Sequence, residues 1–169
     1  MSAQQPNSRQ HYHVGNLAEQ LFSSARSMLE EVGVAKLSMR ALCSALGVTA
    51  TAAYHHFTNR AELLAQLATQ GYLELAEELN EKVVALPVEE KIRGFCLIYL
   101  NFGRRNPALY QLMFGPELEF EQMPEHLLNA RQQAFSRLEL MVADLLKQTP
   151  DSPDVRSAAL ASWSYIHGL

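Results

Sequence analysis

The sequence predicts an all-α protein of two parts, in which one long helix joins a small N-terminal helical bundle to a larger helical body. Apolar residues recur at three- and four-residue spacing over most of the chain, which is the period of an amphipathic helix. Prolines and glycines interrupt this pattern between the predicted helices. A chain of 169 residues with 48% hydrophobic residues can fold as one compact domain, or as a small domain fused to a larger one.

The first predicted helix runs from Gly15 to Glu31. Its apolar residues recur at the spacing of one helical face, so this face should pack against the rest of the bundle. Gly33 follows the last apolar residue and should end the helix, since glycine favours the position after a helix C-terminus. The face consists of Leu17, Leu21, Ala25, Met28 and Leu29.

The stretch from Leu37 to Leu64 predicts two short helices, a tight turn between them and the start of a long third helix. The hydroxyls of Ser38 and Thr49 can cap the two short helices, and Gly47 tolerates the positive φ that the turn needs. The second short helix, Ala50 to His56, carries small and hydrogen-bonding side chains, which suit insertion into a DNA major groove. The pattern therefore predicts a helix-turn-helix.

Six side chains in this unit are candidates for DNA contact, because they combine hydroxyl, phenol, imidazole and guanidinium donors in and beside the second helix. The alternative for the tyrosine at 54 is packing between helices. For His56 and Phe57 this packing is the preferred interpretation, since one face must close the bundle. The six candidates are Arg40, Thr49, Thr51, Tyr54, His55 and Arg60.

The segment GVTATAAYHHFTNRAELL resembles the signature of the tetracycline-repressor-like (TetR/AcrR) transcriptional regulators. Thr49 replaces the usual serine and Arg60 the usual lysine, whereas Thr51 and Ala52 depart from a common glycine and threonine. The resemblance implies a double-stranded DNA operator that is nearly palindromic, a homodimer, and a repressor released by a small molecule. The residues that match the signature are Gly47, Val48, Tyr54, His56, Phe57 and Leu63.

A second motif near the end of the chain resembles one subgroup of the same family. Trp163, His167 and Gly168 are similar to the Trp…His-Gly motif of its C-terminal domains. In that subgroup the chain continues through at least one more helix, and the last helices form the dimer. The resemblance thus leads us to expect that this chain is truncated at Leu169, which leaves its dimerisation open.

Five further helices are predicted beyond the helix-turn-helix. The fourth helix begins near Asn59, whose side chain can cap it, and ends near Ala85. Gly71 lies inside it and should allow either close packing or a bend. Prolines bound the helices that follow, which we place at Val88–Arg104, Pro107–Phe114, Pro124–Gln148 and Val155–Leu169.

Aromatic residues are dense in the predicted body, where the resembling family holds its inducer. An aromatic stripe at helical spacing is more often core than cavity, so both interpretations stay open for each residue. As a group they predict a mainly apolar effector of medium size, with a tyrosine or histidine as polar anchor. The candidates are Phe95, Tyr99, Phe102, Tyr110, Met113, Phe114, Trp163 and His167.

The charge is unevenly distributed along the chain. Residues 1–60 carry five Lys and Arg against three Glu, a balance of +2, whereas residues 61–169 carry nine against fifteen Asp and Glu. This split supports a DNA-binding head despite the overall charge of −4, although a balance of +2 can also be an ordinary fluctuation.

Other protein classes find little support in the sequence. The two cysteines, Cys43 and Cys96, lie in apolar helical segments and fit reduced thiols. There is no membrane span, secretory signal, phosphate loop or metal-ligand spacing, so we expect a cytoplasmic protein that is not an enzyme and uses no cofactor or metal.

The predicted domain organisation has three parts. Residues 1–13 form an arm, which is either a disordered tail or a minor-groove contact through Arg9, His11 and His13. Residues 14–58 form the helix-turn-helix domain, and residues 59–169 form the regulatory body. The alternative function is an all-helical protein that binds ligands or other proteins without specific DNA binding.

Overall fold

The structure is a computed structural model that describes residues 17–118 and 123–168. Every regular element in these ranges is a helix, so the predicted all-α class is confirmed. The predicted arm and the first residues of the predicted first helix lie outside the described residues. The elements are α1 (Leu17–Val32), η2 (Val34–Lys36), α2 (Met39–Leu46), α3 (Ala50–Tyr54), α4 (Arg60–Val84), α5 (Val88–Arg105), α6 (Pro107–Phe114), α7 (Glu125–Leu146) and α8 (Pro153–His167).

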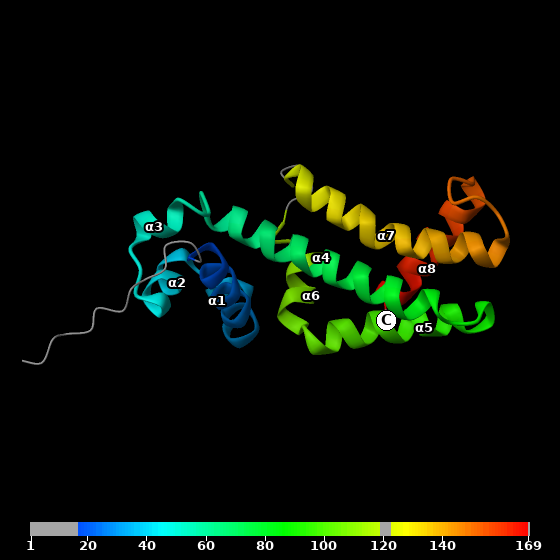
Figure 1. Cartoon of the computed structure of the whole chain (residues 1–169), viewed down its shortest axis with the longest axis horizontal. Helices are drawn as coiled ribbons and strands as arrows, with labels where there is room; N and C mark the ends of the chain where they lie inside the picture. The colour runs from blue at the N-terminus through cyan, green and yellow to red at the C-terminus, as the bar shows by residue number, and fades with distance from the viewer. Residues whose placement is uncertain (1–16, 119–122, 169) are drawn as a thin grey trace, which may run out of the picture.

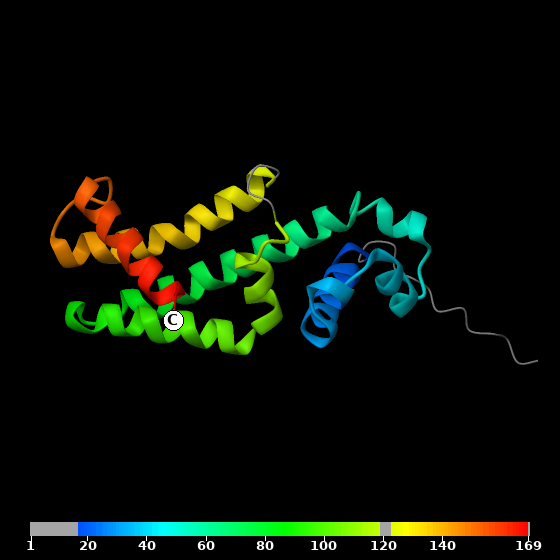
Figure 2. The same ribbon diagram turned by 180° about the vertical axis from the view of Figure 1, so that it is seen from behind.

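The helices form a head and a body that share α4 (Figure 1). Helices α1, α2 and α3 gather at one end of the molecule, and α4 runs from them into the body. Its 25 residues span roughly 37 Å. In the body α4 packs against α5, α6 and α7, and Figure 2 shows α8 crossing from the far end of α7 toward α5.

The head takes its shape from local signals that the sequence predicts correctly. Ser38 accepts a hydrogen bond from the Ala41 amide at 3.1 Å and caps α2. Gly47 ends that helix at φ 65°, in the left-handed region that glycine tolerates. Asn59 caps α4 in the same way through the Glu62 amide at 2.8 Å. These caps set the directions in which α2, α3 and α4 leave their turns.

Gly71 allows α4 and α6 to pack closely, which settles one of the two predicted roles for this residue. A Cβ atom at this position would lie 2.6 Å from Met113 Sδ and 2.9 Å from Leu109 Cδ2. Both distances are too short for real contacts, so a side chain fits here only if the Met113 and Leu109 side chains move. The glycine therefore brings the middle of α4 into direct contact with α6.

Several predicted boundaries are wrong by one or two residues. The helix predicted to reach His56 ends at Tyr54, and the side chain of His56 is exposed instead of packed. Helix α7 ends at Leu146 because Lys147 adopts a left-handed conformation, with φ 53°, that allows the Gln148 amide to bond the Ala143 carbonyl at 3.0 Å. No glycine marks this helix end in the sequence.

Two apolar features were also unforeseen. The short helix η2 lies in the predicted gap between the first two helices and buries Val34. Ile92, which the pattern placed on the buried face of the fifth helix, is 55% exposed.

None of the helices in the described ranges combines the length and apolarity that a membrane crossing requires.

Candidate functional site

Helix α3 has exposed polar side chains on its outer side and is held to the head by buried apolar residues. Ala53 and Phe57 are buried against the rest of the head, and they hold the helix in place. Thr51, Tyr54 and His55 are exposed on the helix and at its end, and the tyrosine is 48% exposed despite its large ring. Three hydrogen-bonding side chains thus stand together on the outside of the head.

Two more of the predicted DNA-contact residues flank this surface. Arg40 is exposed on α2. Thr49 caps α3 by accepting a hydrogen bond from the Ala52 amide at 3.2 Å, and its hydroxyl hydrogen remains a donor for another acceptor. Both side chains lie on the exposed part of the helix-turn-helix.

Arg60 has a different environment from the other five. Its Nε donates to the Leu37 carbonyl at 2.7 Å, and its Nη2 donates to the Val34 carbonyl at 2.6 Å. The guanidinium therefore ties the first residue of α4 to the two ends of the η2 turn. The geometry differs from the predicted clamp on the DNA backbone, because two of the donors already bind protein carbonyls.

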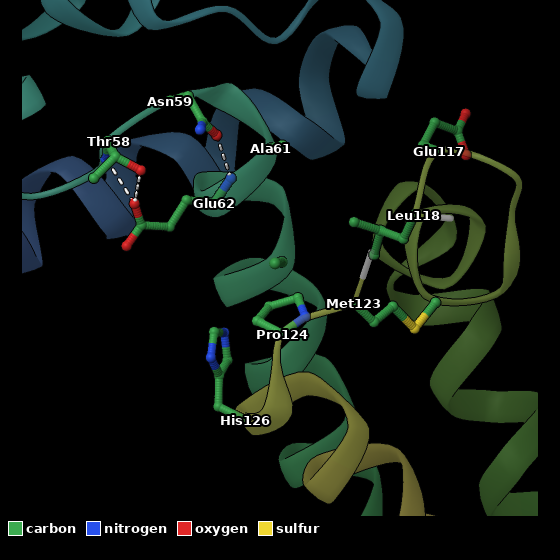
Figure 3. Close-up of a pocket in the computed structure, with 10 residues that line it drawn as sticks. Thr58, Asn59, Ala61, Glu62, Glu117, Leu118, Met123, Pro124 and His126 are labelled. Atoms are coloured by element: carbon green, nitrogen blue, oxygen red, sulfur yellow. Dashed lines mark hydrogen bonds between the residues drawn. The ribbon is translucent and has the colours of Figure 1, made fainter. Parts of the chain in front are cut away.

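The joint between α3 and α4 is held by a second set of hydrogen bonds (Figure 3). The carboxylate of Glu62 accepts from the Thr58 amide at 2.6 Å and also from the Thr58 hydroxyl. The hydroxyl bond, followed by the amide bond, lowers the pKa of Glu62 below its ordinary value. The ionised Glu62 side chain therefore helps to hold the turn between α3 and α4.

An open hollow of about 530 Å³ lies beside this joint, which we call the junction hollow. Residues at the start of α4 form one side, and residues before and at the start of α7 form the other (Figure 3). The junction hollow therefore lies between the α3–α4 joint and the part of the body at the start of α7. Its lining is Thr58, Asn59, Ala61, Glu62, Ala65, Glu117, Leu118, Met123, Pro124 and His126.

Helix α1 of the head also binds the N-terminus of α6. The Glu30 carboxylate accepts hydrogen bonds from the Ala108 and Leu109 amides, both at 3.1 Å. A negative charge is favourable there because the first amides of a helix have no partner within it. One turn earlier, Arg26 donates to Glu74 of α4 at 3.2 Å and to Asn106 at 3.0 Å. Head and body are thus joined through α6 as well as through α4.

A larger pocket of about 860 Å³, also open to solvent, lies between α4, α6, α7 and α8 of the body, and we call it the body cavity. Four of the eight predicted ligand-binding residues line it: Met113, Phe114, Trp163 and His167. The other lining residues are Tyr72, Gly115, Leu118, Met123, Leu128, Asn129, Arg131, Gln132, Phe135, Arg156 and Leu160. Leu118 and Met123 line the junction hollow too.

The remaining four predicted residues lie outside this lining. Phe95, Tyr99 and Phe102 are buried, which is the packing alternative that the aromatic pattern left open. Tyr99 and Tyr110 stand behind His167: their hydroxyls lie 2.9 and 3.1 Å from its Nδ1 and 3.0 Å from each other. Burial raises the pKa of Tyr99, so its phenol stays protonated.

The cavity lining also contains polar and aromatic residues that the aromatic pattern did not predict. Tyr72 on α4 is one of them; burial raises its pKa to about 12, and its hydroxyl donates to the Met113 carbonyl at 2.5 Å. Five others are on α7, and four of these are at positions 128, 131, 132 and 135. Spacings of three and four residues put them on one helical face, which a search for mixed polar and apolar faces would have found.

The described residues offer no assembled metal site. In the part of the chain that the structure describes, no three His, Cys, Asp or Glu side chains come together as metal ligands would. Cys43 is buried and Cys96 partly buried, and neither forms a disulfide. Burial raises the pKa of Cys96, which disfavours the reactive thiolate.

The fold and the matched segments identify the family. Residues 21–67 match the bacterial regulatory proteins of the tetR family, and residues 92–169 match the tetracyclin repressor-like C-terminal domain. The nucleoid occlusion factor SlmA of Vibrio vulnificus is 30% identical over 140 residues, which cover 79% of this chain and 68% of that protein. This chain belongs to the TetR family. It is a DNA-binding transcriptional regulator, as the sequence predicts.

Solved structures of TetR-like proteins have the same fold. A protein of unknown function from Rhodococcus sp. RHA1 is 27% identical and superposes with a TM-score of 0.80, covering 95% of this chain and 84% of that one. The TetR family transcriptional regulator PfmR from Thermus thermophilus, at 21% identity, has a TM-score of 0.66 and covers 87% of this chain and 82% of its own. In this TetR-family chain the first matched segment contains α2 and α3.

Proposed function

We propose that this TetR-family regulator is a repressor that binds a nearly palindromic operator as a homodimer and leaves it when a small effector enters the body cavity. The observation that carries the proposal is the course of α4. The helix starts at the joint below the exposed surface of α3, and Tyr72 in its middle lines the cavity. One rigid element therefore reaches both places.

On the DNA side, the surface of α3 supports contacts to bases and phosphates. Thr51, Tyr54 and His55 would meet the major groove, with Thr49 and Arg40 at the neighbouring phosphates. We infer that Arg60 acts as a positioning residue, because its guanidinium holds the η2 turn. A dimer would place two such surfaces about 34–36 Å apart on one face of the DNA.

On the effector side, α6 supports the link to the head. Met113 and Phe114, at the C-terminal end of α6, line the cavity, while its N-terminal amides bind Glu30 of α1. An effector that displaces Phe114 would move α6 and strain the Glu30 contact. An effector shifts the equilibrium only by its difference in affinity between the two states, so the cavity must bind it more tightly in the state that releases the DNA.

The finer family and domain assignments belong to the same proposal. We place the helix-turn-helix domain at residues 14–58 and the regulatory body at 59–169, with residues 1–13 as an arm. The Trp163…His167-Gly168 motif supports membership in the Trp…His-Gly subgroup, since two of its three residues line the body cavity. Operator binding implies a cytoplasmic protein, and we assign it no catalysis because its relatives are regulators.

The DNA assignment can be tested with one tyrosine variant and one control. Genomic fragments selected on the full chain supply the operator, and fluorescence anisotropy measures its affinity. Tyr54→Ala should weaken binding by about tenfold, since one good base or phosphate contact contributes roughly 1–3 kcal/mol. Tyr165→Ala, which removes a tyrosine 72% exposed on α8, should leave the affinity unchanged.

Unaltered affinity and unaltered salt dependence in Tyr54→Ala would contradict the DNA contact. They would favour the alternative of a helical ligand-binding or interaction protein without specific DNA binding. A second candidate role, nucleoid occlusion, is favoured by the 30% identity to SlmA. Mapping the occupied chromosomal sites separates the two roles: release from promoters by an effector supports the repressor, and effector-independent occupancy across the chromosome supports nucleoid occlusion.

A further inference from the structure

The exposed side chains of α3 are poor in the groups that recognise a base through two hydrogen bonds. Arginine and lysine recognise guanine in this way, asparagine and glutamine recognise adenine, and carboxylates accept from cytosine. Among the described residues 49–60, which hold α3 and the turn after it, only Asn59 and Arg60 belong to these types. The availability of these two side chains therefore decides how this segment can recognise bases.

Both side chains already have partners inside the protein. The Asn59 Oδ1 accepts from the Glu62 amide at 2.8 Å and holds the side chain at the start of α4, beside the junction hollow (Figure 3). Two of the three guanidinium nitrogens of Arg60 donate to the Leu37 and Val34 carbonyls. These contacts direct both side chains to the protein, so α3 depends on its other exposed residues for base recognition.

The exposed side of α3 carries methyl groups and one aromatic ring. Ala50, Thr51 and Tyr54 are exposed, whereas Ala53 is buried and anchors the opposite side of the helix. Spacings of three and four residues place the Ala50 and Thr51 methyl groups beside the Tyr54 ring. The Thr51 hydroxyl and the His55 imidazole add single hydrogen bonds, which distinguish bases less well than a paired contact does.

Methyl groups and ring carbons match the C5-methyl group that thymine presents in the major groove. Alanine, threonine and aromatic side chains make apolar contacts with this group. The exposed side of α3 from residue 50 to residue 54 extends about 6 Å along the helix axis, which is close to the rise of two base pairs. One α3 helix can therefore contact neighbouring base pairs of a half-site.

We propose that α3 selects thymine in each operator half-site, through contacts of the Ala50 and Thr51 methyl groups and the Tyr54 ring with thymine C5-methyl groups. This inference rests on the proposed DNA contact and deepens it, because it names the base that the helix selects. Sequence selection by α3 then comes from apolar contacts, while Thr49 and Arg40 at the phosphates add affinity for any sequence.

Deoxyuridine tests this selection because it differs from thymidine only by the missing C5-methyl group. The operator is selected on the full chain, and each thymine of a half-site is replaced by deoxyuridine, one at a time. Fluorescence anisotropy should show that one or two of these replacements raise the Kd about fourfold, as the loss of a buried methyl group does. The same replacement outside the half-sites should leave the Kd unchanged.

A cytosine series restores the methyl group on another base. Changing a sensitive T·A pair to C·G removes the methyl group and also changes the hydrogen-bonding groups. 5-Methylcytosine at that position returns the methyl group alone, so this operator should bind about fourfold more tightly than the cytosine operator. Equal affinity for the two operators would overturn the methyl contact.

Substitutions at Thr51 assign the contact to its side chain. Thr51→Ser removes one methyl group and keeps the hydroxyl, so at one sensitive position it should bind the thymine and deoxyuridine operators equally. Thr51→Val keeps a methyl group and should retain the fourfold difference. Thr69→Ser is the matched control, because it removes the same methyl group on α4 and keeps the hydroxyl that donates to the Ala65 carbonyl; it should also retain the difference.

The outcomes separate the selected base from DNA binding itself. Half-sites without thymine, or deoxyuridine replacements that never raise the Kd, would overturn thymine selection, while a loss of affinity in Tyr54→Ala would still support the DNA contact. A deoxyuridine effect that is the same at every position in Thr51→Ser as in the parent would overturn the role of Thr51. If no genomic fragment is selected, or if Tyr54→Ala changes neither affinity nor salt dependence, the proposed DNA contact itself is wrong.

Discussion

The head and the body of this regulator present their functional groups in opposite ways. In the head, a helix of only five residues turns its polar side chains outward, and its position depends on caps and on a few buried anchors. In the body, four helices turn theirs inward around a cavity of about 860 Å³. The exposed surface of α3 depends on the rigidity of one small unit. The lining of the body cavity depends on the distances between helices.

Under the proposed function, this difference explains how an effector would act on DNA binding without touching α3. The α3 surface has little internal freedom, because Thr49 caps the start of α3, and Thr58 and Glu62 hold the turn that joins α3 to α4. The body cavity lies between helices from separate parts of the chain, among them α6 and α8, so we expect its size to change more easily than the shape of the α3 surface. Regulation should therefore move the head as a unit, and three substitutions test this expectation.

The largest effect should come from Arg60→Ala. The loss of two bonds from a guanidinium to the Leu37 and Val34 carbonyls should cost about 2 kcal/mol in the free energy of unfolding, measured by urea denaturation. DNA affinity should fall, but the slope of its logarithm against the logarithm of salt concentration should stay unchanged, because no phosphate contact is lost.

Arg40→Ala is the matched comparison on the same domain. It should leave the free energy of unfolding within about 0.5 kcal/mol and reduce the salt slope by about 1. If Arg60→Ala reduces the slope as well, Arg60 contacts phosphate, and the positioning role inferred from its hydrogen bonds fails.

A smaller effect is expected for Glu30→Gln at the contact between head and body. The loss of the charge at the α6 N-terminus should destabilise the protein by about 0.5–1 kcal/mol. The effector concentration that releases half of the DNA should change, while operator affinity without effector should change less, as anisotropy would show. The neighbouring Glu31→Gln, on the exposed part of α1, is the control. If Glu30→Gln leaves the effector response unchanged, the contact between α1 and α6 does not couple the body cavity to DNA binding.

The smallest effect is a pH dependence at Glu62. Because its folded pKa lies below the ordinary value of 4.5, the Thr58 bonds stabilise the protein above that pH. The stabilisation is lost as the pH falls through the folded pKa. Glu62→Gln should therefore be less stable than the parent at pH 7, and the two should converge in acid, as measured by thermal unfolding. A gap that persists below the folded pKa would contradict the assignment.

The head can be predicted from the sequence more fully than the body cavity. The head depends on neighbours in sequence: Ser38, Thr49 and Asn59 each cap the helix that follows directly, so local chemistry is enough to locate α2, α3 and α4. The family signature falls in this part as well. Arg60 is the exception, because its partners lie 23 and 26 residues away and no local pattern reveals them.

The body cavity is formed by residues on several helices, so the pattern of a single helix does not reveal it. The aromatic pattern selects Phe114 and Trp163, which line the cavity, but it cannot separate them from Phe95 and Phe102, which are buried in the packed core. Arg156 looks like any exposed arginine until α8 is placed beside α7. Side chains become cavity residues only through the packing of helices that are remote in sequence.

The close contact at Gly71 has a consequence for how this protein can vary. Glycine inside a helix costs about 1 kcal/mol relative to alanine, so a chain free to change would replace it. The Leu109 and Met113 side chains prevent this, since a Cβ atom would overlap them. A larger residue at 71 therefore requires a smaller one at 109 or 113. Among related sequences these three positions should change together, and their covariation would record the contact between α4 and α6.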